Sequence, residues 1–369
     1  MKKQILVVGG AGYIGSHAAM ALDAAGYDVL VFDNLSTGHA DFLRFGRFEN
    51  GDLADRAALD RVLESGDIRA IMHFAAFINV GESVSNPGKY YRNNLASTLN
   101  LLEAARDHGV GNIIFSSTCA TYGTPQSLPL REDHPQHPIN PYGRAKLAVE
   151  WMLRDFSSAY GLRCCIMRYF NAAGAAPASL GARIGERHDP ETHLIPLVLR
   201  AAMHPGGKVG IFGTDYPTED GTCIRDYIHV CDLAEAHVLA MERMLAGEPG
   251  TALNLGNGLG YSVREVVECV QEVTGLPVRV EYNPRRPGDA GILVGDASRA
   301  ASELGWRPKF ADLKTIVGSA YDWEKQLEHF KVENTYGRAG AEKCGENSEG
   351  KKHGFPRAAS GPRNDRKLS

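Results

Sequence analysis

The chain has 369 residues, of which 43% are hydrophobic and 23% charged, and its formal net charge is −4. This composition supplies enough apolar material for one large core or two joined lobes, and it lacks the basic excess typical of nucleic-acid-binding proteins. The seven cysteines form no C-x-x-C pair and the 13 histidines are scattered, so we expect no disulfide framework and no metal site. Free thiols suit a cytoplasmic protein.

The N-terminal half alternates short apolar runs with helical patterns. The first run, Ile5–Val8, is too short for a signal peptide or a membrane span and predicts a buried strand. Further strands are predicted at Val29–Phe32, Ala70–Phe74 and Asn112–Ser116, and helices at Tyr13–Ala25, Arg56–Leu63 and Leu95–His108. This alternation predicts an α/β fold with a Rossmann-type, doubly wound parallel sheet. No segment is apolar enough to suggest a membrane protein.

The texture of the sequence changes after Asn171, where Gly and Pro become frequent. We expect an NAD-binding domain over residues 1–171 and a smaller mixed α/β substrate-binding lobe over 172–330. Part of 225–250 is expected to return to the first domain, since it resembles a strand end and a long helix. Residues 331–369 hold few apolar side chains and predict a disordered tail.

A glycine-rich loop separates the first predicted strand from the first predicted helix. Gly9, Gly12 and Gly15 have the spacing G-x-x-G-x-x-G, with Tyr13 and Ile14 inside the motif. Glycines allow a sharp turn and close approach of the backbone to a pyrophosphate, which the free N–H groups of the helix N-terminus then bind. The strand before and the helix after make the motif a specific signal for a dinucleotide.

An acidic residue ends the second predicted strand. Asp33 can accept hydrogen bonds from both adenosine ribose hydroxyls and repel a 2′-phosphate, which favours NAD over NADP. Asp52, in Gly51-Asp52-Leu53, is predicted to lie at the adenine edge, although a plain turn role is also typical of Asp.

A tyrosine and a lysine have the spacing of one helical turn in Pro141–Lys146. We expect Lys146 to favour the phenolate of Tyr142 and to lower its pKa, so that Tyr142 acts as a base. Ser116-Ser117-Thr118 ends a predicted strand upstream, and its hydroxyls can bind the same substrate oxygen. Alone, each pattern is also typical of an ordinary surface pair or a cap.

Together these motifs resemble the UDP-glucose 4-epimerases of the extended short-chain dehydrogenase/reductase family, especially bacterial forms of polysaccharide synthesis. The resemblance covers about residues 4–325. Its motifs are Gly9–Gly15, His73–Ala76, Val80–Ser83, Tyr90–Asn94, Phe115–Thr118, Asn140–Lys146, Arg168–Asn171, Asp220–Val230 and Arg285–Asp289.

The resemblance implies NAD as cofactor and a UDP-sugar as substrate. Tyr142, Lys146 and Thr118 would be catalytic, while Asn171, Arg225, Arg286 and Asp289 would hold the UDP-sugar. Further cofactor contacts would come from Tyr13, Ile14, Asn34, Asp52, Leu53, Phe74, Ala75, Ala76, Asn93, Ser116 and Tyr169. It also implies a homodimer formed by helices at Leu95–His108 and Ala145–Tyr160. Without the family, Arg225-Asp226 reads as a local ion pair.

Three positions bear on the reaction. Cys119 and Ala120 follow Thr118, where related dehydratases carry an acid for the leaving hydroxyl, so loss of water is not expected. Ile78 replaces a lysine found in some family members, and Leu293 aligns beside the sugar pocket. The preferred sugar stays open among glucose/galactose, xylose/arabinose and N-acetylated forms. A non-catalytic binding protein and a net oxidoreductase or decarboxylase are the alternatives.

Overall fold

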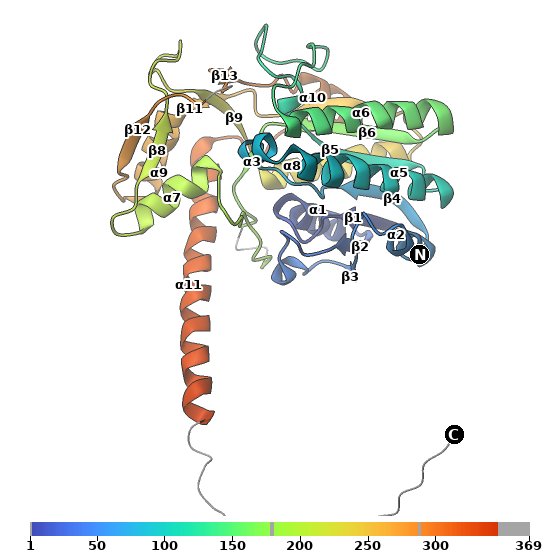
Figure 1. Ribbon diagram of the computed structural model, residues 1–369, viewed down its shortest axis with the longest axis horizontal. Coiled ribbons are helices and arrows are strands. Elements are labelled where there is room, and N and C mark those ends of the chain that lie inside the picture. The colour runs from blue at the N-terminus through green and yellow to red at the C-terminus, as the bar shows by residue number, and fades with distance from the viewer. Residues whose placement is uncertain (1, 178–180, 287–288, 346–369) are drawn as a thin grey trace, which may run out of the picture. The chain divides into compact units, whose positions relative to one another are not determined.

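A parallel sheet forms the centre of the computed structural model, which describes residues 2–177, 181–286 and 289–345, the last sixteen of these by backbone only (Figure 1). Seven of the described strands run in the order β10-β6-β5-β4-β1-β2-β3, all parallel. Their bounds are β1 Gln4–Val8, β2 Asp28–Asp33, β3 Arg47–Asn50, β4 Ile68–His73, β5 Asn112–Thr118, β6 Arg163–Tyr169 and β10 Ala252–Leu255.

Helices cover both faces of this sheet. Successive residues of β1 point to opposite faces, so Ile5 packs in one apolar cluster and Leu6 in the other. The first cluster lies under α1 and α8, and the second under α2, α5 and α6. The bounds are α1 Tyr13–Ala24, α2 Arg56–Glu64, α5 Ser97–Asp107, α6 Pro141–Tyr160 and α8 Val230–Leu245. The predicted doubly wound α/β fold is confirmed, since burial on both faces explains the apolar runs.

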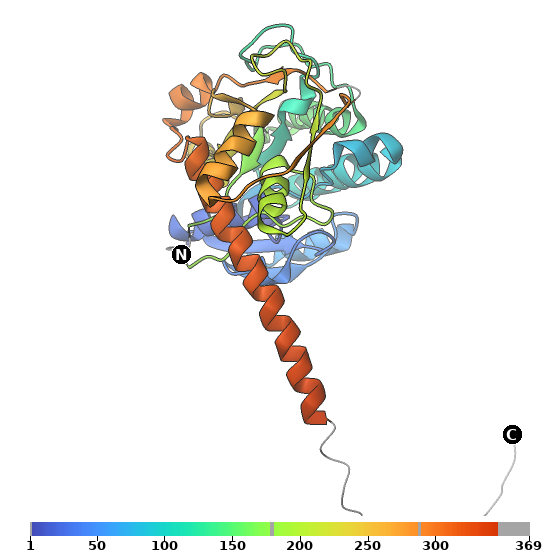
Figure 2. The ribbon, with the colours of Figure 1, turned by 90° about the vertical axis from the view of Figure 1, so that its left-hand side faces the viewer.

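A second sheet follows the sixth strand of the first. Strand β9 pairs with β7, β11 and β13, and β8 pairs separately with β12. Helices α7 and α9 pack on each other over a third apolar cluster (Figures 1 and 2). The bounds are β7 Asn171–Ala173, β8 Val209–Phe212, β9 Ile224–His229, β11 Gly260–Ser262, β12 Val280–Asn283, β13 Ile292–Leu293, α7 Leu194–Met203 and α9 Val263–Thr274.

The chain returns to the large sheet between these elements. Helix α8 packs on α1 and on the sheet, and β10 then adds the edge strand beside β6. The boundary at residue 171 stays a prediction. Residues Met1–Glu324 form one compact unit and Lys325–Ser369 a second.

Short elements complete the described chain. A π-helical stretch, η2, leads directly into α5, so the predicted helix at Leu95–His108 starts with an irregular turn. The remaining bounds are η1 Ala40–Phe42, α3 Val80–Ser85, α4 Pro87–Tyr90, η2 Tyr91–Ala96, η3 Cys119–Thr121, α10 Ser298–Leu304 and α11 Leu313–Gly345. Among the described helices, none combines the length and apolarity needed to cross a membrane.

The disordered tail predicted over residues 331–369 stays a prediction, although the structure gives residues 331–345 as the end of a helix. Helix α11 continues to Gly345. Residues 346–369 lie outside the described part of the chain.

Candidate active site

The predicted site residues gather at the carboxyl edge of the large sheet. Because the strands are parallel, β1, β2, β4, β5 and β6 all end at this edge. The strand order reverses between β4 and β1, which is the switch point where open α/β sheets bind ligands. The glycine loop, Asp33, Phe74–Ala76, Thr118 and Tyr169 all follow or end these strands.

The glycine loop packs closely against neighbouring backbone at the start of α1. Gly9 has φ +81°, and a Cβ added there would lie 2.5 Å from the backbone N of Ala75. A Cβ at Gly15 would collide with the backbone of Gly9. Gly12 is the N-cap of α1 and provides no side-chain cap. The first N–H groups of α1 thus suit the phosphates of a dinucleotide.

Asp33 is fixed beside this loop. Its Oδ2 accepts a 3.0 Å hydrogen bond from the N–H of Ala11, and its Oδ1 accepts a 2.8 Å bond from the N–H of Leu35. Each carboxylate oxygen can accept a further bond, so the ribose role predicted for Asp33 fits the geometry. Asn34 donates to Asp52 over 2.7 Å, which brings these two predicted cofactor residues together.

The segment after β4 lies against the same loop. The N–H groups of Phe74 and Ala75 both donate to the carbonyl of Val8, at 2.8 and 3.2 Å. Asn93 donates to the side chain of Asn94 at 2.9 Å. Asn94, which the sequence analysis did not single out, holds the segment after Ala76 by two 2.9 Å bonds with the backbone of Phe77.

Helix α6 places the predicted base beside the end of β5. Its N-cap Asn140 accepts a 2.8 Å bond from the N–H of Gly143, and Pro141 occupies the first turn, where its missing N–H costs nothing. Tyr142 remains partly accessible, and Thr118 hydrogen-bonds its phenol. The predicted pair of Tyr142 and Thr118 is therefore adjacent in the structure.

Lys146 occupies a different place from the one we expected. Its Nζ donates a 2.7 Å bond to the carbonyl of Ser116 and lies 4.8 Å from the centre of the Phe115 ring. Burial raises the pKa of Tyr142 to about 12, although the hydrogen bond from Thr118 opposes this change. Burial also lowers the pKa of Lys146 to about 7. In this structure the Lys146 ammonium bonds to the backbone of β5, and the expected lowering of the Tyr142 pKa by Lys146 stays a prediction.

A buried ion pair lies one turn further along the face of α6 that holds Tyr142 and Lys146, and the sequence did not reveal it. Glu150 is four residues beyond Lys146 and receives two bonds from Arg168, at 3.0 and 2.7 Å. Ser117 donates to the same carboxylate at 2.6 Å. Removing one partner from such a pair typically costs about 3–5 kcal/mol, so this pair firmly joins α6 to β5 and β6.

Two of the residues predicted to hold the UDP-sugar, Asn171 and Arg225, lie on strands of the second sheet, whereas Arg286 and Asp289 lie between β12 and β13. Arg225 donates a 2.7 Å bond to Asp289, 64 residues away. Asn171 donates to the carbonyl of Asp226 at 2.9 Å, and the Arg286 guanidinium lies 3.9 Å from the centre of the Phe212 ring. The alternative of a local Arg225-Asp226 ion pair is wrong. Asp226 instead accepts backbone bonds, which come from Asn257, Gly258 and Gly295.

Cys119 lies near both Thr118 and the Arg225-Asp226 segment. Burial raises the pKa of its thiol to about 12, and the charges of Arg225 and Asp226 also act on it. The thiol directly after Thr118 is therefore neutral near pH 7. A thiol with so high a pKa is a poor proton donor, so it does not replace the carboxyl group that the related dehydratases carry.

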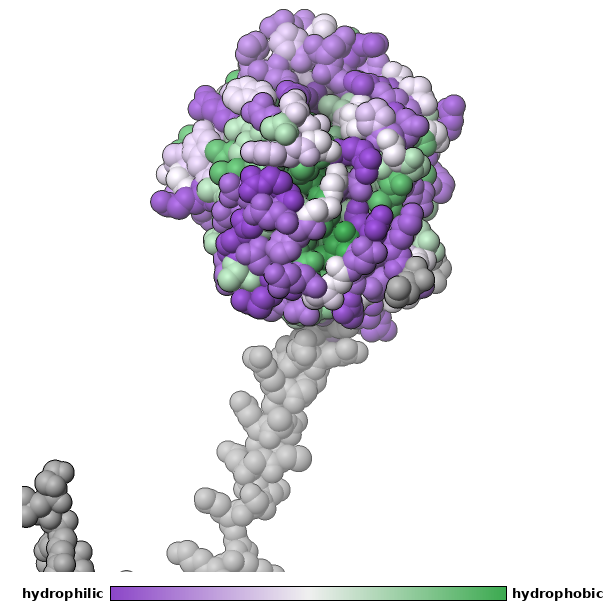
Figure 3. Space-filling model, turned by 90° about the vertical axis from the view of Figure 1, so that its right-hand side faces the viewer, coloured by the Kyte–Doolittle hydropathy of each residue, from purple (hydrophilic) through white to green (hydrophobic). Residues whose placement is uncertain are grey.

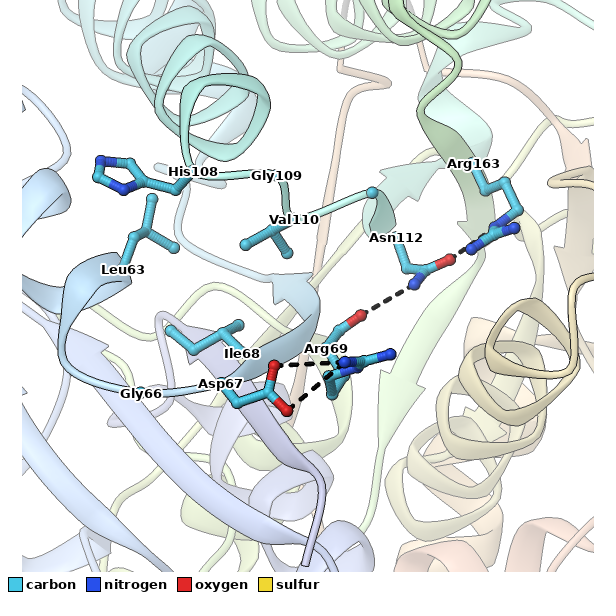
Figure 4. Close-up of a pocket in the computed structure, with 11 residues that line it drawn as sticks. Leu63, Gly66, Asp67, Ile68, Arg69, His108, Gly109, Val110, Asn112 and Arg163 are labelled. Atoms are coloured by element: carbon cyan, nitrogen blue, oxygen red, sulfur yellow. Dashed lines mark hydrogen bonds and ion pairs between the residues drawn. The ribbon is translucent and has the colours of Figure 1, made fainter.

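A depression of about 290 Å³ lies at the other end of the strands. Its walls include the starts of β4, β5 and β6, and Figure 4 shows polar links there from Asp67 to Arg69 and from Asn112 to Arg163. Figure 3 shows the side of the molecule on which the N-terminus lies. Polar side chains surround hollows on this side, and apolar side chains are visible within them. This depression holds none of the predicted catalytic residues.

The family model described as "NAD dependent epimerase/dehydratase family" matches residues 5–256. The chain belongs to this family. A UDP-glucose 4-epimerase of Rhizobium leguminosarum bv. trifolii is 53% identical over 326 residues, which cover 88% of this chain and 98% of the relative.

Solved structures extend the match to three dimensions. The UDP-glucose 4-epimerase of Brucella ovis in complex with NAD has 50% identity and a TM-score of 0.83, covering 87% of this chain and 98% of that chain. The UDP-Glc/GlcNAc 4-epimerase of Campylobacter jejuni has 44% identity and a TM-score of 0.77, covering 88% and 99%.

Proposed function

We propose that this chain is an NAD-dependent UDP-glucose 4-epimerase that interconverts UDP-glucose and UDP-galactose. The observation that carries the proposal is the position of Tyr142. The first turn of α6 holds it beside Thr118. The glycine loop and Asp33, which form the proposed dinucleotide site, lie at the same edge of the sheet. Membership of the family and identity near 50% to proteins named for this activity support the assignment.

The side chains suggest how inversion at C4 proceeds. Bound NAD supplies the acceptor and donor of the C4 hydride and a positive charge that favours the Tyr142 phenolate. Tyr142 removes the proton of the 4-hydroxyl as the 4-keto sugar forms, and Thr118 donates a hydrogen bond to the same oxygen. After the keto sugar turns over, Tyr142 returns the proton. Lys146 holds α6 against β5 through its hydrogen bond to the Ser116 carbonyl.

The nucleotide stays anchored while the sugar turns. Arg225 and Arg286 supply guanidinium groups for the diphosphate, which such groups bind through paired hydrogen bonds. Asn171 and Asp289 complete this set, with Asp289 on the uridine ribose. In this arrangement the Arg225–Asp289 bond holds both side chains ready before substrate arrives.

The choice of sugar rests on fewer observations. Leu293 lies beside Arg225 in the β13–β9 register, so its side chain borders the proposed substrate residues. The Campylobacter jejuni relative is named for both glucose and N-acetylglucosamine forms. UDP-N-acetylhexosamines and UDP-xylose/arabinose are therefore the substrates to test next.

We also propose a homodimer in the cytoplasm. Helices α5 and α6 pack side by side and leave Leu99, Trp151 and Tyr160 exposed, and exposed large apolar side chains can mark an interface. The six cysteines whose side chains are described are all free thiols, as suits a reducing compartment.

Incubation of the purified protein with UDP-galactose, without added cofactor, tests the function. Chromatography should show UDP-glucose at an equilibrium that is reached from either substrate, with no net NADH. An equal mass of product separates epimerisation from oxidation or decarboxylation. If UDP-galactose, UDP-xylose and UDP-N-acetylglucosamine all remain unchanged after NAD is added, the assignment is wrong.

A further inference from the structure

Four side chains with metal-binding atoms converge between β7 and α7. Glu186, His188, Glu191 and His193 have the spacing E-x-H-x-x-E-x-H, and one ligand atom from each lies within 4.8 Å of all the others. The proposed reaction uses none of them. The scattered histidines predicted no metal site, because spacing along the chain does not reveal that the segment folds these four donors toward one point.

The four distances between a histidine nitrogen and a carboxylate oxygen are close to the edges of a small coordination polyhedron. His193 Nδ1 lies 2.8 Å from Glu186 Oε1 and 3.0 Å from Glu191 Oε1. His188 Nδ1 lies 3.4 Å and 3.6 Å from the same two oxygens. A tetrahedral zinc ion with bonds of about 2.0–2.1 Å separates its ligands by about 3.3 Å. The four distances lie on both sides of that value.

Several of these atoms lack the hydrogen bonds that buried polar groups normally make. Glu186 Oε1, His188 Nδ1 and Glu191 Oε2 are buried without a hydrogen-bond partner among the described residues. Glu186 is only 4% exposed. The contact of Glu186 Oε1 with His193 is therefore close in distance but has no hydrogen-bond geometry. A cation among the donors would satisfy these lone pairs.

A proton can fill part of the same role. Burial lowers the pKa of His193, but Glu186 and Glu191 outweigh this effect and raise it to about 10. A protonated His193 would therefore donate a hydrogen bond to Glu191 and place its charge beside Glu186 in the metal-free protein. This arrangement leaves His188 Nδ1 without a hydrogen bond. Metal binding would release the His193 proton, as imidazole ligands must be neutral.

The surroundings hold the four donors in place. The backbone of Glu186 accepts a 2.8 Å bond from Trp323, and the backbone of Arg187 bonds to His39 at 2.7 Å. Arg200 lies 3.7 Å from Glu191 Oε2. The His188 ring meets the Tyr13 ring of α1 edge-on, with 6.2 Å between centroids.

We propose that Glu186, His188, Glu191 and His193 bind one divalent transition-metal ion, zinc in the first instance, which fixes this segment beside the start of α1. Two imidazoles and two carboxylates form a donor set of the type that zinc accepts. Two carboxylates balance the charge of the ion. The ion takes no part in the hydride transfer and stabilises the folded chain.

The test is a Zn²⁺ titration of the purified holoenzyme after chelator dialysis, with elemental analysis of the metal retained. The expected result is one Zn²⁺ per chain and a higher Tm after reloading. His188→Gln and Glu191→Gln should each weaken Zn²⁺ binding by more than about tenfold, the smaller loss typical of outer-shell changes. His204→Gln, an exposed histidine at the end of α7, is the matched control and should bind like the parent.

Co²⁺ provides an independent readout. Loading the parent with Co²⁺ should give the intense visible bands of a tetrahedral site, and both ligand variants should lose them while retaining bound NAD as evidence of folding. Absence of stoichiometric Zn²⁺ binding by the parent, or equal binding by folded ligand variants, would overturn the proposal. Either result would make the cluster an ion-pair network only.

Discussion

The Lys146 ammonium bonds to the backbone carbonyl of Ser116 over 2.7 Å, so the second member of the Tyr-x-x-x-Lys motif joins α6 to β5. This bond fixes the distance between the helix that holds Tyr142 and the strand that ends in Thr118. Lys146 therefore positions the two residues that we propose to contact the reacting oxygen, Tyr142 and Thr118.

Tyr142→Phe should abolish the proton transfer and leave the cofactor site intact. Loss of a general base typically lowers kcat by about 10²–10⁴-fold. Bound NAD, measured after denaturation of the variant, should equal that of the parent. Tyr282→Phe, which changes an exposed tyrosine on β12, serves as the control. Full activity of the Tyr142 variant would remove Tyr142 from the mechanism.

Local motifs made the cofactor half of the site predictable. The glycine loop and Asp33 lie within one strand-helix-strand unit, so spacing along the chain determines their spatial arrangement. The Arg225–Asp289 bond joins residues 64 positions apart and depends on the second sheet. That sheet consists of short strands with weak alternation, so neither its pairing nor the bond could be read from the pattern.

The contacts of Lys146 and Glu150 likewise depend on strands that are distant in the sequence. Periodicity placed Lys146 on the same helical face as Tyr142, but it could not tell that a backbone carbonyl of β5 competes for the ammonium. Glu150 lies one turn further along this face, and its partner Arg168 comes from β6. The spacing of four residues between Lys146 and Glu150 was the available sequence signal for that pair.

Asp33→Asn should weaken NAD binding and narrow the preference for NAD over NADP. The change removes the negative charge that bonds the ribose hydroxyls and repels a 2′-phosphate. Hydrogen bonds to charged groups contribute about 1.5–3 kcal/mol, which corresponds to about 10- to 150-fold in Kd. Titration of the cofactor-stripped protein with each dinucleotide measures this. Asp23→Asn, on the exposed side of α1, is the control and should bind NAD with the affinity of the parent. If Asp33→Asn also bound NAD with the affinity of the parent, the role assigned to Asp33 would be contradicted.

Arg225→Gln should raise KM for the UDP-sugar by about 10- to 150-fold, because a charge-assisted bond to the diphosphate is lost. The loss also frees Asp289 from its partner. Initial rates over a range of UDP-galactose concentrations give KM and kcat separately. Arg285→Gln is the matched control, since Arg285 pairs with Asp215 and stacks on Tyr216. Equal KM changes in both variants would assign the effect to general charge.

Trp151→Glu should convert the proposed dimer to a monomer. Trp151 is 56% exposed on α6, and a buried unpaired carboxylate at the interface would oppose association. Light scattering during size-exclusion chromatography measures the mass. Leu259→Glu, at an apolar residue exposed elsewhere, should keep the parent mass. A parent protein that is already monomeric would refute the dimer.

Acid should destabilise the fold through buried neutral histidines. Burial lowers the pKa of His17 and His237 from 6.5 to about 4, and that of His73 and His229 to about 3. Between about pH 6.5 and 4 the unfolded chain binds protons that the native chain does not, so stability falls as pH falls.

His237→Phe isolates one of these contributions. Its ring packs 4.9 Å from the centre of Phe74 and makes one hydrogen bond, to the carbonyl of Leu233. Urea unfolding at each pH should show that the variant loses less stability than the parent on going from pH 6.5 to 4, by up to about 1.4 kcal/mol per pH unit. An unchanged urea m-value verifies that both proteins unfold alike. Parallel stability curves would mean that His237 titrates equally in the native and unfolded chains, and hence that its burial does not hold it neutral.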